Sequence, residues 1–402
     1  MILDKGIRLA SKSNVGESLS RGRGLRVSWM NRFIELKVGS YTVAFRRDSL
    51  ERYLKKRFSG EVKLVDVRKL GEGFHNAGFM LDFKLNGKPR SLVMRVVRGD
   101  TGWGHDYPSD RASVLLLQHM LYNSAPEGTC IPSIDVLAVM KDGSLTSLGE
   151  SVEFIHLVEP LTEEHGRPYV DYLVEVAERG YLTDMDRRMC LRCSEYLANL
   201  HSEKVENRNL YIRHIRDLVG HGEMLMGVID TYPEELDFIS EEELCRIEVE
   251  AVKWRNRLKK KTYRLSRIHG DFHPFGNIRF KRDGSIMALD LSREMYGEPA
   301  DDVSALTINY IFISIWRLGS LEEPFIQLLR LFYRDYLNRT GDEELLKVIQ
   351  PFYAFRGMVV AHPLYYPDMR REQRRMLVNF VLNVLETEEF NPDEVERYIK
   401  PP

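Results

Sequence analysis

The sequence is poor in the features that mark specialised classes of protein. Only 4 cysteines occur in 402 residues, too few for the disulfide framework of a small secreted domain. The 58 Lys and Arg nearly cancel the 60 Asp and Glu, so charge alone offers no broad surface for a nucleic acid or a membrane. The uncharged run at 303–316 spans 14 residues, short of the ~20 that a transmembrane helix needs. The first residues lack an apolar signal-peptide core, and we therefore expect a cytoplasmic protein.

The first part of the chain differs in composition from the rest. Residues 1–30 contain six Lys and Arg against two Asp and Glu, with frequent Gly and Ser and no sustained helix or strand period. We interpret residues 1–47 as a basic, partly irregular N-terminal extension. A solvated tail is favoured over an arm that binds RNA or a protein partner.

Residues 48–159 carry the pattern of a small, mostly antiparallel sheet. Strands are expected at 62–70, 78–85, 91–97, 133–140 and 151–158, and Asn86-Gly87 between the second and third is a strong hairpin signal. Apolar residues at helical spacing predict a helix at 48–58 and another, inserted after the third strand, at 108–122. We interpret this region as a nucleotide-binding N-lobe with a five-stranded sheet and one inserted helix.

The pattern changes to helices after Pro160. Apolar residues recur at helical spacing at 169–178, 184–202, 241–259, 302–316, 321–337, 343–358 and 373–386. A short hairpin interrupts them, with strands at 278–280 and 286–290 joined by Asp283-Gly284. The sequence therefore predicts an α+β fold of two lobes, in which the N-lobe at 48–159 precedes a larger, mainly helical C-lobe at 160–402.

The strongest chemical signal lies at residues 267–290, RIHGDFHPFGNIRFKRDGSIMALD. Asp271 and Asp290 are 19 residues apart, and the hairpin between them would bring the two carboxylates close together. Asn277 stands just before the first strand of that hairpin. Two carboxylates and an amide oxygen suit Mg²⁺-dependent phosphoryl transfer. In that chemistry one carboxylate takes the proton of the attacking hydroxyl, and the other oxygens hold the metal that bridges the phosphates.

A glycine-bearing turn and a lone cation in the N-lobe complement this set. The turn LGEGFHNAG at 70–78 contains Gly71 and Gly73, which let backbone N–H groups approach phosphate oxygens without a Cβ in the way. Arg95 stands among apolar residues in the third strand, VMRVV, and a phosphate would suit it as a partner. These residues predict a phosphate-binding region in the N-lobe.

Taken in this order, the motifs resemble the aminoglycoside phosphotransferase and choline kinase-like family, within the protein-kinase-like fold. The resemblance covers roughly residues 62–310. His269-Gly270-Asp271 is similar to the family's catalytic loop, and Leu289-Asp290 to its metal-binding aspartate. The stretch GEPADD at 297–302 is similar to the family's Gly-x-Pro-x-x-Asp, whose last Asp is usually structural. LANLH at 197–201 resembles the helix that often precedes the catalytic loop.

The resemblance implies a role for each site residue. Asp271 would act as the base or position the acceptor hydroxyl, and Asn277 and Asp290 would ligate Mg²⁺. Arg95 would contact the α- and β-phosphates of ATP, and residues 157–159 would form the hinge that receives adenine. The nucleotide-binding residues would then be Gly71, Gly73, Asn76, Arg95, Asp110, Leu157 and Glu159.

Three departures from the kinase pattern bear on these roles. Arg95 stands where protein kinases keep Lys, so its reach to the phosphates differs. The inserted helix has no obvious Glu to pair with it; Asp110 is the best candidate, and a helix N-cap is an equal alternative for this residue. Asn277 follows Asp271 by six residues, whereas the kinase template places the Asn five after. A bulge at Gly276, which tolerates positive φ, would absorb the extra residue.

Two absences favour a small-molecule acceptor over a protein. Gly270 replaces the Arg of His-Arg-Asp, and Asp290-Leu291-Ser292 lacks the Phe-Gly of Asp-Phe-Gly, so no activation-loop switch is expected. The predicted activity is transfer of the γ-phosphate of ATP to a hydroxyl of a small molecule such as a sugar, amino alcohol or aminoglycoside-like compound. A catalytically weak or inactive nucleotide-binding protein and an atypical protein kinase are the alternatives. The oligomeric state and the choice between ATP and GTP stay open.

Other residues have simpler interpretations. Cys190 and Cys193 form C-x-x-C but line one helical face, so core packing is favoured over a zinc or redox site. For His269 and His273, structural hydrogen bonding is favoured over a metal or acid–base role. Candidates to line an acceptor pocket, with core packing as the commoner alternative, are Tyr310, Arg356, His362, Tyr365 and Tyr366.

Overall fold

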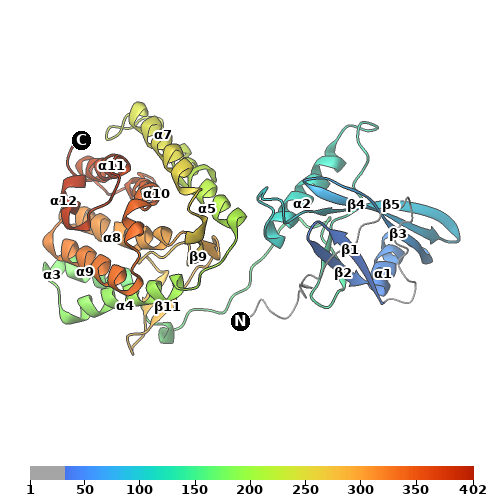
Figure 1. The fold of residues 1–402 in the computed structure, drawn as a ribbon, viewed down its shortest axis with the longest axis horizontal. Helices are drawn as coiled ribbons and strands as arrows, with labels where there is room; N and C mark the ends of the chain where they lie inside the picture. Colours follow the sequence, from blue (N-terminus) through green and yellow to red (C-terminus); the bar gives the residue numbers. More distant parts are fainter. Residues whose placement is uncertain (1–31) are drawn as a thin grey trace, which may run out of the picture. The chain divides into compact units, whose positions relative to one another are not determined.

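The computed structural model describes residues 32–402, which form two compact units (Figure 1). The N-terminal unit extends to Leu157, and the C-terminal unit begins at Val158. The basic segment at 1–30 lies outside the described residues, so its interpretation as a solvated tail stays a prediction. No helix in the described part of the chain is both long and apolar enough to cross a membrane.

The N-terminal unit is built from short antiparallel sheets and two helices over its described residues. In chain order its elements are β1 (Phe33–Val38), β2 (Tyr41–Arg46), α1 (Arg47–Phe58), β3 (Val62–Glu72), β4 (Asn76–Leu85), β5 (Lys88–Val97), α2 (Pro108–Ser124), β6 (Leu137–Val139) and β7 (Leu145–Ser147). β3, β4 and β5 form one sheet in that order, while β1 pairs with β2 and β6 pairs with β7. The turn of the β4–β5 hairpin is Asn86-Gly87, as the sequence predicts.

Strict alternation of buried and exposed residues builds the core of this unit. Ile34, Leu36 and Val38 of β1 point into the core while their neighbours are exposed, and Leu50 and Leu54 of α1 pack against the same cluster. The sequence interpretation assigned residues 33–46 to the irregular extension. The structure instead forms β1 and β2 there, because two six-residue period-2 patterns are long enough to pair once a tight turn joins them.

Two strand predictions are wrong: one strand is shorter than expected and the other is not formed. The strand expected at 133–140 is reduced to β6, and residues 151–158 have no regular structure. Val152 and Ile155 are 98% and 84% exposed, since no neighbouring strand pairs with their backbone. A β-type pattern records a preference for a half-buried pleated surface and does not supply the partner strand. The described unit therefore holds one three-stranded sheet and two strand pairs in place of a single five-stranded sheet.

The C-terminal unit is mainly helical. Its longer elements are α3 (Tyr169–Arg179), α4 (Asp184–His201), α5 (Arg208–Gly220), α6 (Leu225–Asp230), α7 (Glu241–Leu258), α8 (Ala300–Leu318), α9 (Glu323–Thr340), α10 (Gln350–Ala361), α11 (Arg371–Leu385) and α12 (Val395–Tyr398). Its short strands are β8 (Arg167–Pro168), β9 (Ser266–Arg267), β10 (Ile278–Phe280), β11 (Ile286–Ala288) and β12 (Tyr296–Gly297). The strands pair in the orders β11-β10-β8 and β12-β9.

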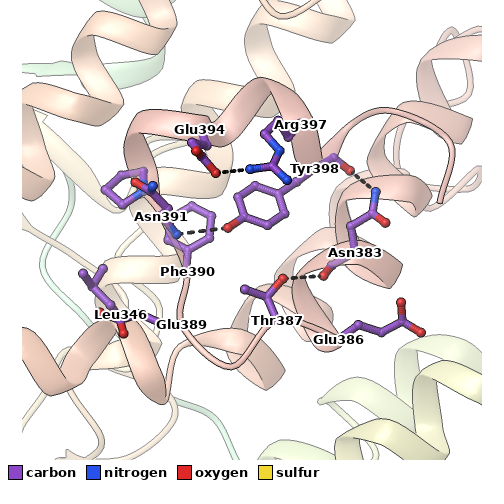
Figure 2. A pocket seen from close by; sticks show the side chains of 11 residues that line it. Leu346, Asn383, Glu386, Thr387, Glu389, Phe390, Asn391, Glu394, Arg397 and Tyr398 are labelled. Carbon is purple, nitrogen blue, oxygen red and sulfur yellow. Dashed lines mark hydrogen bonds and ion pairs between the residues drawn. The ribbon is translucent and has the colours of Figure 1, made fainter.

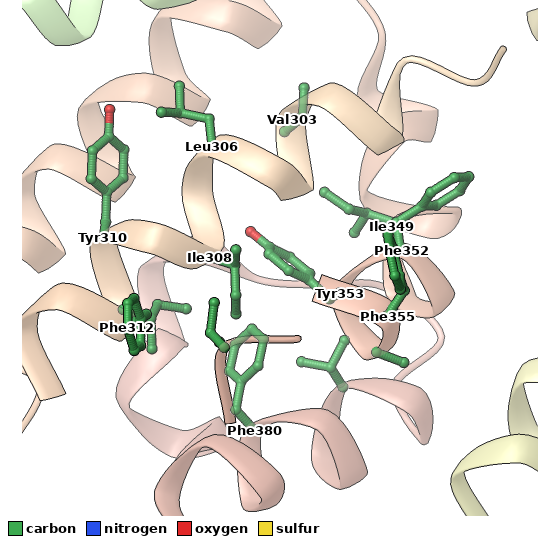
Figure 3. Close-up of a cluster of buried hydrophobic side chains, with 14 of the residues drawn as sticks. Val303, Leu306, Ile308, Tyr310, Phe312, Ile349, Phe352, Tyr353, Phe355 and Phe380 are labelled. Atoms are coloured by element: carbon green, nitrogen blue, oxygen red, sulfur yellow. The ribbon is translucent and has the colours of Figure 1, made fainter. Parts of the chain in front are cut away.

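α8 is the central helix of this unit's core. It packs against α3, α9, α10 and α11, and every residue from Ala300 to Ile315 is buried. Aromatic side chains of α8 and α10 meet in one cluster, in which Phe312, Phe352 and Tyr353 are fully buried (Figure 3). A helix that is apolar all round belongs in a protein core or a membrane. The uncharged run at 303–316 is therefore a buried core helix, and it holds the polar residues at its start in a fixed position.

Most helix predictions for this unit are confirmed, with two differences. α5, α6 and the short α12 were not predicted. The helix expected at 343–358 is divided into a 3₁₀ turn at Glu343–Lys347 and α10, because Pro351 lacks a backbone N–H and favours the first turn of a new helix. Side-chain caps explain where others begin: Thr183 accepts a hydrogen bond from Asp186 N at the start of α4, and Ser240 from Glu243 N at the start of α7.

Replacement of Gly297 by Ala tests how tightly β12 packs. A Cβ at Gly297 would lie 2.4 Å from Ile268 Cδ1 and 2.6 Å from His214 Cε1, both in buried side chains. We expect Gly297→Ala to reduce the free energy of unfolding by about 1–3 kcal/mol in denaturant titrations. Gly220→Ala is the matched control, since a Cβ there meets no atom within 4 Å and Ala is the better helix former. Equal stability of the two variants would contradict the packing described.

Candidate functional site

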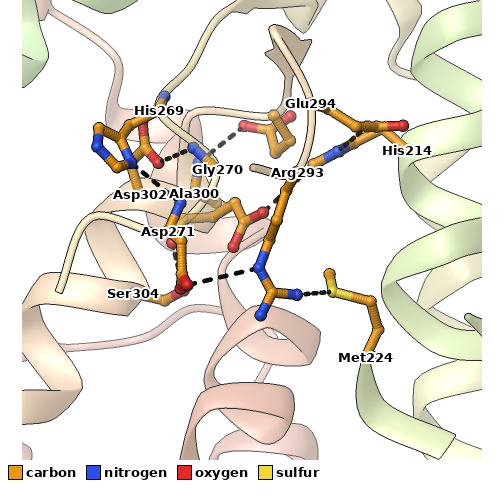
Figure 4. A network of polar contacts seen from close by, with 12 residues as sticks. His214, Met224, His269, Gly270, Asp271, Arg293, Glu294, Ala300, Asp302 and Ser304 are labelled. Carbon is orange, nitrogen blue, oxygen red and sulfur yellow. Dashed lines mark hydrogen bonds and ion pairs between the residues drawn. The ribbon is translucent and has the colours of Figure 1, made fainter. Parts of the chain in front are cut away.

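Asp302 anchors the loop that carries Asp271. The carboxylate of Asp302 lies on the first turn of α8 and accepts hydrogen bonds from His269 N and Gly270 N, both at 2.7 Å (Figure 4). His201 Nε2 donates to the same carboxylate at 3.1 Å, and its Nδ1 accepts from Tyr336 OH at 2.7 Å. Burial opposes ionisation of Asp302, but the contacts with His201 and the loop hold its pKa below the usual value. Asp302 is therefore the structural Asp that the family resemblance implies.

The turn between Asp271 and Asn277 absorbs one extra residue. His273 N donates to Asp271 O and Gly276 N to Pro274 O, each at 2.9 Å, so the chain doubles back twice within six residues. Gly276 has φ +122°, a conformation that residues with a Cβ rarely adopt. Asn277 Nδ2 then reaches Asp271 O at 2.9 Å. Gly276 thus has the positive φ expected of it, and Asn277 returns to the start of the loop.

The β10–β11 hairpin brings Asp290 to the same place. Ile278 pairs with Ala288, and Leu289 N donates to Asn277 O at 2.9 Å. Asp290 follows directly, with an exposed side chain and the left-handed φ of +58°, a strained conformation of the kind that gathers at functional sites. Burial lowers the pKa of His273, and the negative charges of both Asp271 and Asp290 oppose that shift. The structure therefore brings together Asp271, Asn277 and Asp290 within the C-terminal unit.

The oxygen atoms at this place fit a magnesium ion. Asn277 Nδ2 donates to the backbone oxygen of Asp271, while Asn277 Oδ1 accepts no hydrogen bond from a described residue. Mg²⁺ is usually held by one or two protein oxygens together with phosphates and waters, and Asn277 and Asp290 provide such a pair. Among the described residues, no group of three His, Cys, Asp or Glu side chains forms a metal site by itself. With Asn277 and Asp290 as its protein ligands, a bound Mg²⁺ would take its remaining ligands from phosphates and waters.

Two arginines contact the carboxylate of Asp271, which is mostly buried. Arg356 Nη1 donates to Asp271 Oδ1, and Arg293 Nε lies 3.6 Å from Asp271 Oδ2. Burial alone would raise the pKa of Asp271, but the charges of Arg356 and Arg293 outweigh it and hold the pKa below the usual value. Arg293 also donates to Glu223 O at 3.1 Å, which ties it to the segment before α6. Asp271 is therefore ionised at neutral pH.

A chain of alternating charges leads from Asp271 into the protein. Arg356 Nη2 donates to Asp301 Oδ1 at 2.7 Å, and Asp301 Oδ2 lies 4.0 Å from His214 Nε2. His214 Nδ1 lies 2.7 Å from Glu294 Oε2 (Figure 4). Burial opposes the charge on His214, but Glu294 and Asp301 raise the pKa of His214 to about 9. We call Glu294, His214, Asp301, Arg356 and Asp271 the charge chain.

The glycine turn of the N-terminal unit is open. Gly73 N donates to Asn76 O at 2.9 Å, which closes the turn between β3 and β4. A Cβ at Gly71 or Gly73 would meet no atom within 4 Å, so the space beside the backbone is free. Arg98, which the sequence interpretation missed, donates to Gly73 O at 3.1 Å and pairs with Asp100.

Arg95 and Asp110 are not paired with each other. Arg95 lies opposite Gly78 in the sheet, is exposed, and donates from Nη1 to Tyr122 OH at 2.9 Å. Asp110 Oδ2 accepts from Tyr107 N at 2.7 Å at the start of α2. Residues 110 and 122 are separated by about 18 Å along the helix. Arg95 therefore does not pair with Asp110. Asp110 is not the N-cap either: Tyr107 is the N-cap, and Asp110 at the third helical position accepts a hydrogen bond from its backbone N–H.

The remaining candidates divide between exposed and core positions. Leu157 and Glu159, expected at the hinge, are exposed in a segment without regular structure, and their role stays a prediction. Tyr310 and His362 are fully buried and therefore do not line an open acceptor pocket, whereas Tyr365 is half exposed. Cys190 and Cys193 are buried free thiols, as expected for core packing. Both histidines of the loop make structural hydrogen bonds: His269 Nδ1 accepts from Asp271 N at 3.3 Å, and His273 Nδ1 accepts from Phe275 N at 3.2 Å.

A cavity in the C-terminal unit is separate from this loop. It has about 770 Å³ and lies between the end of α11 and α12 (Figure 2). Its polar side chains are already paired: Asn383 Nδ2 donates to Tyr398 O at 2.8 Å, and Arg397 pairs with Glu394. None of its lining residues belongs to the loop or the charge chain. The chemistry is therefore assigned to the loop and not to the cavity.

Comparison with known proteins gives matches among solved structures only. No family model and no curated protein matches the chain. A Plasmodium vivax ethanolamine kinase is 14% identical over 86% of this chain and 84% of its own, with a TM-score of 0.31. A glucosamine kinase is 14% identical over 82% of this chain and 95% of its own, with a TM-score of 0.36.

An aminoglycoside phosphotransferase, APH(3'')-Id from Streptomyces rimosus, is 18% identical over 75% of this chain and 98% of its own, with a TM-score of 0.28. These structures are kinases of small molecules. At these identities and TM-scores they assign no activity to this chain, and the proposed function rests on the residues of the loop.

The charge on His214 gives stability a defined pH dependence. Because its folded-state pKa of about 9 lies above the ordinary 6.5, the ion pair stabilises fully below pH 6.5 and is lost as the pH rises through about 9. We expect His214→Gln to lower the free energy of unfolding by roughly 2–3 kcal/mol at pH 6 and by clearly less at pH 10. Denaturant titrations at both pH values measure this difference.

The exposed His156→Gln variant is the control, and it should match the wild type at both pH values. If His214→Gln cost the same stability at pH 6 and pH 10, His214 would be neutral in the folded protein and the charge chain would be interrupted there.

Proposed function

We propose that the chain is an ATP-dependent phosphotransferase that transfers the γ-phosphate to a hydroxyl of a small molecule. The observation that carries the proposal is the convergence of Asp271, Asn277 and Asp290 at one end of the β10–β11 hairpin. A carboxylate for the acceptor proton and two oxygen ligands for a metal are the parts that phosphoryl transfer requires. The same three residues were the ones chosen from the sequence.

Asp271 would act on the acceptor. One of its oxygens, Oδ1, is engaged by Arg356, which leaves Oδ2 to accept a hydrogen bond from the acceptor hydroxyl. As the acceptor oxygen bonds to the γ-phosphorus, the bond from that phosphorus to the β,γ-bridging oxygen breaks and ADP leaves with its electrons. The acceptor proton passes to Asp271. A carboxylate of lowered pKa suits this task, because in a loose transition state the hydroxyl is oriented first and loses its proton late.

Asn277 and Asp290 would hold Mg²⁺ through Asn277 Oδ1 and the Asp290 carboxylate. The bound ion supplies positive charge to the β- and γ-phosphate oxygens. Gly276 has a part in this arrangement, since its positive φ lets Asn277 face the start of the loop. A residue with a Cβ at this position would be strained, and Asn277 would be displaced.

Most of the remaining proposed nucleotide-binding residues belong to the N-terminal unit. The open backbone beside Gly71 and Gly73 leaves room for phosphate oxygens, and Asn76 closes that turn. Arg95 is exposed and bound only to a neutral hydroxyl, so its charge is free to meet a phosphate. Asp110 would act indirectly by fixing the start of α2, and Leu157 and Glu159 would receive adenine.

A small hydroxyl compound is the proposed acceptor. The similar structures are named for ethanolamine, glucosamine and aminoglycosides, which are amino alcohols or sugars. Within this chain, Gly270 stands where protein kinases have Arg, and its N–H donates to Asp302. The loop is therefore fixed from within the protein and needs no phosphorylated segment to order it, which favours a small molecule over a protein as acceptor.

Asp271→Asn tests the proposal. With ATP and Mg²⁺, the wild type should release ADP with at least one compound in a panel of amino alcohols, amino sugars and aminoglycosides. Asp271→Asn should lower that rate by about 10²–10⁴-fold, the usual contribution of a general base. ATP with Mg²⁺ should still raise the melting temperature of the variant, because Asp271 acts on the acceptor.

Two results would contradict the proposed function. One is an Asp271→Asn variant that turns over at the wild-type rate. The other is a wild type that ATP stabilises equally with Mg²⁺ and with EDTA and that releases no ADP, which would identify the chain as a nucleotide-binding module without catalysis.

A further inference from the structure

Arg356 is a lone charge in an apolar helix segment. α10 reads QPFYAFRGMVVA, and Arg356 is only 5% exposed between Phe355 and Gly357. Burying a guanidinium costs several kcal/mol unless its hydrogen bonds and charge are matched. Arg356 Nη1 donates to Asp271 Oδ1, and Nη2 donates to Gly270 O at 2.9 Å and to Asp301 Oδ1 at 2.7 Å. Every acceptor that satisfies Arg356 thus belongs to the loop or to the start of α8.

These bonds fix the orientation of Asp271. The carboxylate of an Asp can rotate about its Cβ–Cγ bond. Arg293 and His273 lie 3.6 and 3.9 Å from Oδ2 of Asp271. Arg356 holds Oδ1 and, through Gly270 O, also the backbone just before Asp271. The planar guanidinium offers several donors in a rigid fork, so it sets the position and the rotation of the carboxylate together.

Asp301 completes the arrangement from a rigid element. It lies next to Asp302 on the first turn of α8, whose residues are buried from Ala300 onward. Asp302 accepts hydrogen bonds from two backbone N–H groups of the loop, and Asp301 holds the loop through Arg356. Neighbouring residues on one core helix therefore control both the backbone and the side chain of the loop. His214 approaches the other oxygen of Asp301 and balances its charge.

We propose that Arg356 is a positioning residue for phosphoryl transfer: it holds the Asp271 carboxylate so that Oδ2 faces the acceptor hydroxyl, and Asp301 in turn holds Arg356. This inference rests on the proposed function, because it gives Asp271 the role assigned above. Arg356 acts through Asp271 and not on the acceptor, because it is only 5% exposed and its Nη1 and Nη2 donate to Asp271, Gly270 and Asp301. Its Nε is buried and has no hydrogen-bond partner among the described residues.

The test compares Arg356→Met and Arg356→Lys with the wild type, using the acceptor that gives ADP release. We expect Arg356→Met to lower kcat by roughly 10²-fold with little change in KM for ATP. Arg356→Lys keeps a charge but loses the fork, so it should recover part of kcat. If Arg356→Met fails to fold, the reduced kcat of Arg356→Lys carries the test.

Arg374→Met is the matched control. Arg374 is as deeply buried as Arg356 but donates to the backbone carbonyls of Ala361 and Tyr366 rather than to a carboxylate. It should lower the melting temperature and leave kcat near the wild-type value. The proposal is overturned if both Arg356 variants keep the wild-type kcat, or if Arg374→Met lowers kcat as much as Arg356→Met does.

The two proposals fail in different ways. Wild-type turnover by Asp271→Asn overturns the proposed function and this inference with it, before any Arg356 variant is made. Loss of turnover in Asp271→Asn, together with unchanged Arg356 variants, overturns only the positioning role.

Discussion

The contact of two adjacent carboxylates with one loop is the constraint on which the candidate site depends. Asp302 accepts two backbone N–H groups of the loop, and Asp301 reaches Asp271 through Arg356. Both carboxylates are fully buried at the start of α8, where an unpaired charge would cost several kcal/mol. The loop is thus required for the stability of the helix start, and the helix start holds the loop in place. Such support from a rigid core element is what a precise catalytic geometry needs.

The short hairpin gives the site its second constraint. β10 and β11 are only three residues each, yet their pairing and the bond from Leu289 N to Asn277 O place Asp290 beside Asn277. The left-handed φ of Asp290 and the positive φ of Gly276 lie on either side of this hairpin. The strained backbone of Asp290 is consistent with a functional site, because strained residues persist where the surrounding structure fixes them. The proposed metal ligands are therefore held by backbone pairing, whereas the proposed base is held by side-chain charges.

The parts of the site that are close in sequence could be predicted, and the parts that depend on distant helices could not. Asp271, Asn277 and Asp290 fall within one hairpin, so residue types and spacing were enough. Asp301 and His214 contribute through tertiary packing, which no local pattern records. Arg356 had a usable signal, a lone cation in an apolar helix. The same pattern at Arg95 does not correspond to burial, since β5 leaves that side chain exposed, and its contact with a phosphate stays a prediction. For the fold, the α8 core helix was clear from its apolar run, while residues 151–158 had a β pattern without a partner strand.

The most direct measurement of the central claim is a double-mutant cycle on kcat with Asp271→Asn, Arg356→Lys and the combined variant. If Arg356 acts only through Asp271, its replacement removes nothing further once Asp271 has lost its charge, and the combined variant should be as slow as Asp271→Asn alone. Losses that multiply in the combined variant would contradict the account, because they would show that Arg356 supports turnover by a route that does not pass through Asp271.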